Sequence, residues 1–320
     1  MDNQPKPREK LTFSVVVKIV KDTVRGFGDD NVTGLSASLA YATLFALIPF
    51  LSLIITIGTF FHTDLGNELY AQLQPIVGEE VVARLREILD SASNSDSSTL
   101  AAIIALGVTI FGATAIFAEV QGSLNTIWGI KAVPKKGWLK YIRTRLLSFS
   151  IILVFAFILL ITFTITNIIE NLSARIMANY PEITRSFVKI VGMLINFTVT
   201  TFVFVLLFKM LPDAKIKSKD VIVGACITTI LFLVGQWGIS LYIGLGNVGS
   251  VYGAAAFMVV LITWIYYSAM IIYIGAEFTK SWANEVGSKI APDEYAVTTK
   301  VIEIQQDKPA ESVNKVRIKV

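Results

Sequence analysis

Charged residues are scarce in this sequence, and cysteine and histidine are almost absent. Of the 320 residues, 54% are hydrophobic and 16% are charged, with one cysteine and one histidine. Soluble domains carry about 25% charged residues. The lone Cys226 excludes a disulfide framework within one chain and a metal site built from cysteines. The charge is also missing in long continuous blocks, which favours membrane insertion over a large soluble core.

Motifs for soluble chemistry are missing as well. The sequence has no glycine-rich phosphate loop followed by lysine, no His-Glu-x-x-His and no Cys/His metal spacing. A metal-dependent nuclease needs several carboxylates or histidines that converge on the metal, and the scattered acids do not form such a set. We therefore expect no enzymatic activity, no catalytic residue, no metal or other cofactor, and no nucleic-acid partner.

Five uncharged blocks are long enough to cross a bilayer, which takes about 20 mostly apolar residues. The last block, 221–276, is long enough for two crossings, and its glycine-rich middle at 244–253 predicts a turn. The predicted fold class is all-α, a polytopic bundle of six transmembrane helices in a domain of residues 37–276. The spans lie near 37–61, 99–118, 146–169, 188–210, 221–243 and 254–276.

Lysine and arginine alternate between the two sides of these spans. Six lie in residues 1–36, six follow span two, four follow span four and seven lie in the tail, whereas the other loops hold few. Loops rich in lysine and arginine stay in the cytoplasm. We therefore expect a multi-pass protein of the bacterial inner membrane with both termini cytoplasmic. No cleavable signal peptide is evident, so the first span is expected to act as the insertion signal.

Residues 1–36, the predicted cytoplasmic N-terminal segment, contain an amphipathic pattern. Its apolar positions fall on one helical face: Phe13, Val16, Val17, Val20, Val24 and Phe27. Lys18, Lys21 and Arg25 lie away from that face, which favours an interfacial helix on the inner membrane surface. An ordinary helix packed under the bundle is the alternative. The cytoplasmic tail, 277–320, has mixed charge and few aromatics, so we expect it to be weakly ordered.

Polar residues within the spans form helical stripes that face inward, because lipid offers them no partner. Two interpretations stay open: tight packing of helices through small and polar residues, or a partly polar cavity open to the cytoplasm. The candidates for the lining of a cavity or its mouth are Gln121, Asn125, Asn196, Gln236, Tyr266, Tyr273 and Glu277.

Three charged residues near the predicted inner interface are expected to have a structural role. Glu119 points away from the Gln121 and Asn125 face of span two. We therefore predict a structural ion pair between Glu119 and either Arg143 or Arg145, which enter span three after a short loop.

Four stretches of the sequence resemble the YihY/BrkB family of bacterial inner-membrane proteins. They are 37–49, 121–129, 211–213 with 224–225 downstream, and 252–277. The family-motif residues within them are Tyr41, Pro49, Trp128, Gly129, Pro212, Tyr252, Gly253 and Trp264. Ala42 departs from the pattern, because the family often has a second aromatic residue there.

The resemblance implies an envelope role. Family members were formerly mislabelled ribonuclease BN, some are associated with serum resistance, and one is linked to movement of lipid A precursors. We predict that the protein transports or flips a lipid-like or amphipathic envelope molecule. The alternative is a non-transporting envelope assembly or interaction protein. Membrane lipids are the expected partners, and a homo-oligomer or an envelope protein partner stays open.

Overall fold

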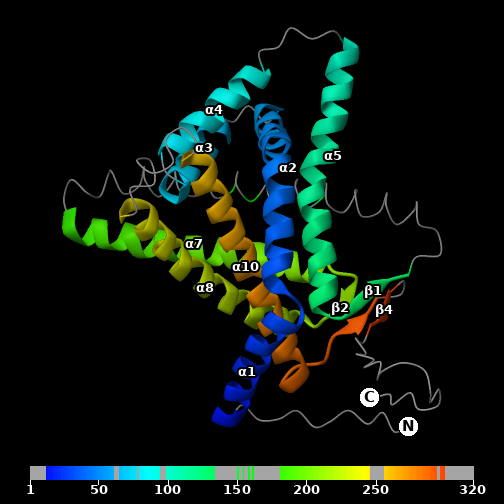
Figure 1. The fold of residues 1–320 in the computed structure, drawn as a ribbon. Helices are drawn as coiled ribbons and strands as arrows, with labels where there is room; N and C mark the ends of the chain where they lie inside the picture. The colour runs from blue at the N-terminus through cyan, green and yellow to red at the C-terminus, as the bar shows by residue number, and fades with distance from the viewer. Residues whose placement is uncertain are drawn as a thin grey trace.

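The computed structural model is almost wholly helical in the residues that it describes (Figure 1). These are residues 12–60, 65–77, 79–93, 99–133, 150, 154, 158, 161, 181–245, 256–293 and 296–299. The helices are α1 (Phe13–Asp29), α2 (Val32–Phe60), α3 (Leu65–Val77), α4 (Glu79–Ser93), α5 (Thr99–Ile127), α7 (Pro181–Met210), α8 (Ser218–Leu245) and α10 (Ala256–Glu285). The strands are β1 (Ile130–Ala132), β2 (Ala214–Lys215), β3 (Ala291–Pro292) and β4 (Ala296–Thr298).

Helices α2, α5 and α10 form the centre of the molecule. Helix α2 packs against both α5 and α10, α1 packs against α10, and α7 packs against α8. In Figure 1, α7 and α8 run obliquely to α2 and α5. The main core includes Leu39, Phe117, Leu124, Phe204, Phe208, Ala269 and Tyr273. A second cluster, which includes Leu51, Val81, Leu85 and Ile265, joins α2 and α10 to α4.

Helices α8 and α10 approach each other through glycines that face threonines. A Cβ atom on Gly224 would lie 1.9 Å from Thr279 Oγ1, and one on Gly275 would lie 2.0 Å from Thr228 Oγ1. These pairs place the start of α8 beside the end of α10, so the two helices are antiparallel. The arrangement agrees with the predicted hairpin, whose predicted turn at 244–253 lies outside the described residues from position 246 on.

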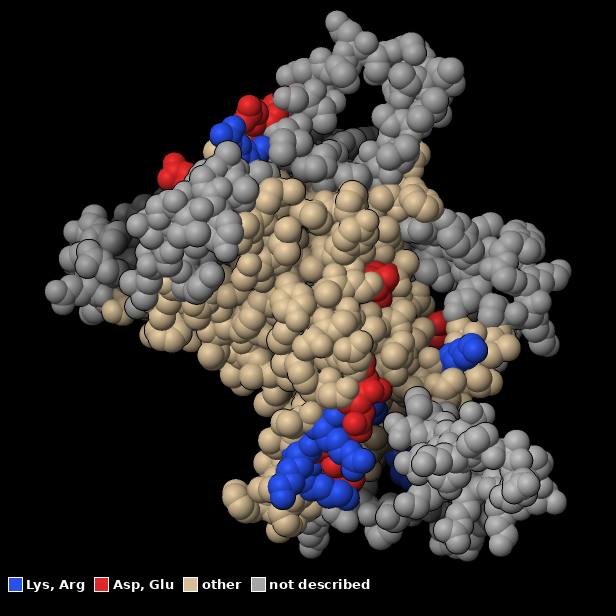
Figure 2. Space-filling view, viewed as in Figure 1, with Lys and Arg blue, Asp and Glu red and all other residues tan. Residues whose placement is uncertain are grey.

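Apolar side chains cover exposed faces of the helices. On α7 the exposed fractions are 60% for Phe187, 60% for Ile190 and 71% for Met193, and on α8 Trp237 is 68% exposed. Such continuous apolar faces are typical of a lipid-facing surface. Figure 2 shows a broad tan face with Lys and Arg gathered at the end that holds α1 and a second charged group over α4.

Three described helical segments are long and apolar enough to cross a membrane: Ser186–Met210, Ser218–Ile239 and Met258–Glu285. They coincide with the fourth, fifth and sixth predicted spans. The first span lies within α2, where Val32–Leu47 is a shorter apolar segment, and α2 continues as a helix through Pro49. The second lies within α5. The third, 146–169, falls outside the described residues except for 150, 154, 158 and 161.

Helix α1 packs on α10 through a face other than its predicted apolar face. Its buried residues are Val15, Ile19 and Thr23. The predicted stripe stays mostly exposed, with Phe13 at 84% and Val24 at 68%. The helix therefore has two apolar faces, one packed against protein and one open.

Part of the predicted weakly ordered tail is regular structure. Helix α10 extends nine residues beyond the predicted end of span six, and β4 pairs antiparallel with β1 while β3 pairs with β2. Thr299 N donates to Gly129 O at 2.7 Å. The order comes from backbone groups of the loops after α5 and α7, and the composition of the tail alone does not reveal it. Residues 300–320 lie outside the described part of the chain.

Candidate functional site

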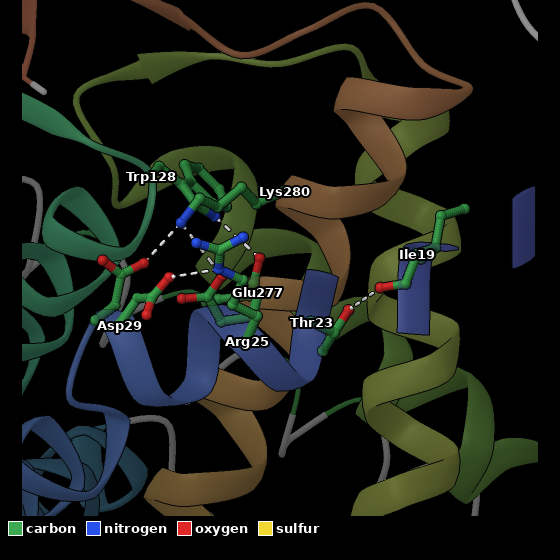
Figure 3. Close-up of polar contacts among 9 residues, drawn as sticks. Ile19, Thr23, Arg25, Asp29, Trp128, Glu277 and Lys280 are labelled. Carbon is green, nitrogen blue, oxygen red and sulfur yellow. Dashed lines mark hydrogen bonds and ion pairs between the residues drawn. The ribbon is translucent and has the colours of Figure 1, made fainter. Parts of the chain in front are cut away.

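The C-terminal part of α10 holds the most deeply buried acidic side chain among the described residues. Glu277 is 1% exposed and lies against α1. A Cβ atom on Gly26 of α1 would lie 2.3 Å from Glu277 Oε2, so the backbone of α1 directly covers the carboxyl group. Figure 3 shows Glu277 and Lys280 on α10 beside the turn of α1 that carries Arg25.

Lys280 joins two acidic side chains in this region. Its Nζ lies 2.6 Å from Asp30 Oδ2 and 3.3 Å from Glu277 Oε2. Asp30 follows the end of α1, so Lys280 joins the end of α1 to Glu277 of α10. We call Gly26, Asp30, Glu277 and Lys280 the Glu277 cluster.

Several buried polar atoms around this cluster have no hydrogen-bond partner among the described residues. They are Glu277 Oε1, the Tyr273 hydroxyl and Ser123 Oγ. Because an unmet buried polar group costs about 1–3 kcal/mol, these three atoms at one end of α5 and α10 are candidates for contact with water or with a polar ligand.

Trp128 anchors the neighbouring backbone. Its Nε1 donates to Ala276 O at 3.2 Å, so the motif residue fixes the residue before Glu277. Gly129 has φ +62 at the turn between α5 and β1, a conformation that glycine adopts without the steric cost of a Cβ atom. The Trp128–Gly129 motif therefore has a structural explanation.

Asn125 is bound to the loop after α7. Its Oδ1 accepts from Asp213 N at 2.9 Å, and its Nδ2 donates to Asp213 Oδ2 at 2.9 Å. Both ends of the amide are used, so Asn125 joins α5 to the loop that also contains the buried Pro212. Gln121 is buried one turn earlier on α5, at 7% exposure.

Glu119 has a partner other than the predicted arginines. Its Oε1 accepts a hydrogen bond from Ser38 Oγ of α2 at 2.5 Å. Arg143 and Arg145 lie outside the described residues, so the predicted ion pair stays a prediction. Glu119 therefore contacts α2, the helix with which α5 shares much of its surface.

The other predicted site residues do not gather at the inner end. Asn196 is exposed on α7, Gln236 is partly buried on α8, and Tyr266 packs beside the second core cluster. Tyr41 is 68% exposed and contacts Phe45, with ring centroids 4.7 Å apart. Tyr252 and Gly253 lie outside the described residues.

The structure adds residues that sequence reasoning missed. Gly26, Asp30, Ser123 and Lys280 complete the inner-end site, although Asp30 and Lys280 are separated by 250 positions. An aromatic series also crosses the core through side chains in edge or stacked contact: Trp128, Phe208, Phe204, Phe232 and Trp264. The sequence does not distinguish these phenylalanines from lipid-facing ones, because every face of the predicted spans four and five carries apolar residues.

Comparison with known protein families and curated proteins identifies the family of this chain. A family model described as virulence factor BrkB matches residues 23–297. The chain belongs to this family. The match includes α1 from residue 23 and the tail strands, so the BrkB family region extends beyond the predicted spans at both ends.

Three curated relatives are each named UPF0761 membrane protein. One from Cronobacter sakazakii is 24% identical over 258 residues, covering 78% of this chain and 83% of the relative. One from Alteromonas mediterranea is 22% identical over 296 residues, covering 90% and 93%. One from Rhodospirillum centenum is 26% identical over 281 residues, covering 86% and 59%. No solved structure matches the chain.

Among the described residues, no group of three or more His, Cys, Asp or Glu side chains is placed to hold a metal ion. The Glu277 cluster instead combines two carboxyl groups with one ammonium group. This chemistry suits binding of protons or polar headgroups.

Proposed function

We propose that this BrkB-family membrane protein transports or flips a lipid-like or amphipathic envelope molecule. The observation that carries the proposal is the set of unmet polar atoms at the inner end, on Ser123, Tyr273 and Glu277. These atoms are buried in the described structure, so a polar headgroup would reach them only after the surrounding helices, α1 among them, had moved apart. It would then supply the missing hydrogen bonds. A bundle held together by packing alone has no use for these atoms.

The proposed placement is in the bacterial inner membrane, with six crossings and both termini in the cytoplasm. The 30 residues of α10 span about 45 Å, whereas the hydrocarbon core is about 30 Å thick. The last turns of α10, from Glu277 on, therefore extend into the inner interface. Helix α1 then lies on the inner surface, where its open apolar stripe enters the headgroup region and the exposed Lys21 faces anionic lipids.

Reconstitution of the purified protein in vesicles tests the proposal. Vesicles of phosphatidylethanolamine and phosphatidylglycerol carry a trace of fluorescent lipid, and dithionite reduces the label only in the outer leaflet. We expect protein-containing vesicles to expose inner-leaflet label faster than empty ones. Mass spectrometry of lipids that copurify with the protein then identifies the headgroup class.

Tyr273→Phe is the matched test of the site. The change removes one hydroxyl group that makes no hydrogen bond, so it should leave the folded protein intact, yet we expect it to slow lipid movement severalfold. Tyr41→Phe makes the same change on the exposed surface of α2 and should leave the rate unchanged. Lipid movement no faster than in empty vesicles would contradict transport of these lipids. A stable complex with another envelope protein would then support the assembly role.

A further inference from the structure

The charges around Glu277 do not balance. Two carboxyl groups, on Asp30 and Glu277, converge on the single ammonium group of Lys280, which lies 0.7 Å closer to Asp30 (2.6 Å against 3.3 Å). The nearby cations of α1 have other partners: Lys18 pairs with Glu285 at 2.7 Å and Arg25 with Asp29 at 3.2 Å. Within the described part of the chain, the two carboxyl groups therefore share one cation.

Glu277 is the carboxyl group that cannot use water instead. It is 1% exposed, whereas the side chain of Asp30 keeps 22% exposure. Glu277 Oε1 accepts no hydrogen bond in the described structure. A buried carboxylate without compensation is strongly unfavourable, and such a group takes up a proton or is paired.

The space beside the carboxyl group limits what can neutralise it. A single Cβ atom on Gly26 would approach Glu277 Oε2 to 2.3 Å and Oε1 to 3.1 Å. The backbone of α1 therefore closes this side of the carboxyl group to anything as large as a methyl group. A proton needs no such space, and the neighbouring acceptor for the resulting O–H is the Asp30 carboxyl group, which contacts the same ammonium group.

We propose that Glu277 is a proton-binding site that couples proton uptake to the docking of α1 on α10. In the docked state Glu277 is a neutral carboxylic acid that donates its O–H to the Asp30 carboxylate. When the O–H bond breaks, the proton passes to water by way of the partly exposed Asp30. The charged Glu277 then needs water or a second cation, and α1 moves away from α10 to admit it.

Glu119 is the nearest charged group contributed by α5. It acts on the Tyr273 hydroxyl one turn before Glu277 on α10 and is bound to Ser38. The proposal stands independently of lipid transport, because proton binding and helix docking can be measured without a transported substrate.

Infrared difference spectroscopy of the full-length protein in lipid nanodiscs tests proton binding. As the pH is raised from neutral to alkaline, we expect loss of a C=O band of a protonated carboxylic acid and gain of carboxylate bands. Glu277→Gln should lack this change. Glu285→Gln, on the same helix in an ordinary ion pair with Lys18, should keep it. A wild-type difference spectrum equal to that of Glu277→Gln would overturn the proposal.

Asp30→Asn provides a second test that does not depend on the Gln variant folding. Without the Asp30 carboxylate, Lys280 is free to pair with Glu277, which then loses its proton at lower pH. We expect the acid band to be absent at neutral pH in this variant. A band that titrates as in the wild type would show that Asp30 and Glu277 do not share a proton.

Helix docking is followed by the distance between spin labels on Lys21 of α1 and Asn284 of α10, both exposed, after replacement of Cys226. The distance should lengthen with rising pH in the wild-type background and stay short in Glu277→Gln. A distance that does not change with pH in either background would contradict the coupling, even where the infrared result holds.

Discussion

Glycine and threonine residues in α8 and α10 show that small residues of the last two predicted spans serve helix packing. Gly224 faces Thr279 and Gly275 faces Thr228, and each threonine hydroxyl donates to the carbonyl four residues earlier on its own helix. These threonines therefore satisfy their own hydroxyl groups and leave no polar atom for a cavity. Of the two interpretations of the stripes, close helix packing is the one that these four residues support.

The packing predicts a specific cost for adding one methyl group. Gly224→Ala would place its Cβ 2.9 Å from Thr279 Cβ as well as 1.9 Å from the hydroxyl, and neither atom can rotate far. We expect a loss of about 1–3 kcal/mol in the free energy of unfolding, as for other overpacked cores. Denaturant titration of the protein in detergent measures it.

Gly238→Ala is the matched control on the same helix. A Cβ atom there meets nothing within 4 Å, so the higher helix propensity of alanine should leave stability equal or slightly raised. Thr279→Ala should recover part of the loss in the Gly224→Ala background. Equal stability of the two glycine variants would show that α8 and α10 are less tightly packed than this structure indicates.

Tail strands show how elements distant in sequence tie the inner ends of the helices together. Strand β4 pairs with β1 after α5, and β3 pairs with β2 before α8. Ser288 also donates its N–H and hydroxyl to Asp220 Oδ2 at 3.1 and 2.7 Å, at the first turn of α8. Residues 286–299 therefore hold the ends of α5 and α8 beside α10.

This function of the tail predicts different results for two truncations. A chain that ends at residue 299 keeps every described strand pair and should match the full chain in thermal stability. A chain that ends at Glu285 loses both pairs and the bonds to Asp220, so its melting temperature in detergent should fall by several degrees. Limited proteolysis should then cut near β1. The same melting temperature for both truncations would show that the strand pairs contribute nothing to stability.

The sequence predicted elements well where one chemical property repeats over a whole helix. The long apolar blocks predicted α2, α5, α7, α8 and α10, because a helix that contacts lipid or the protein core must be apolar over its whole length. It missed the strands, which are two or three residues long and have no period. It also missed the Glu277 cluster, because an ion pair such as Asp30 with Lys280 depends on how helices meet and leaves no local pattern.

At the scale of the whole molecule, segments that are rich in lysine and arginine along the chain also lie together in space. Lysine and arginine are concentrated in residues 1–36, in the loops after spans two and four and in the tail. The described parts of these segments meet at one end, where α1 packs on α10 and the tail strands pair with β1 and β2. Helices α3 and α4 lie at the other end in Figure 1.

The last prediction is the membrane sidedness that follows. Single cysteines replace Ser93, at the end of α4, and Lys136, four positions after the last residue of β1, in a chain whose Cys226 is changed to serine. Because lysine-rich loops are retained in the cytoplasm, a membrane-impermeant maleimide added to intact spheroplasts should label residue 93 and leave residue 136 unlabelled. In inverted inner-membrane vesicles the pattern should be reversed. Labelling of both positions from one side would require an even number of crossings between them, which contradicts the single crossing by α5 and with it the six-span topology.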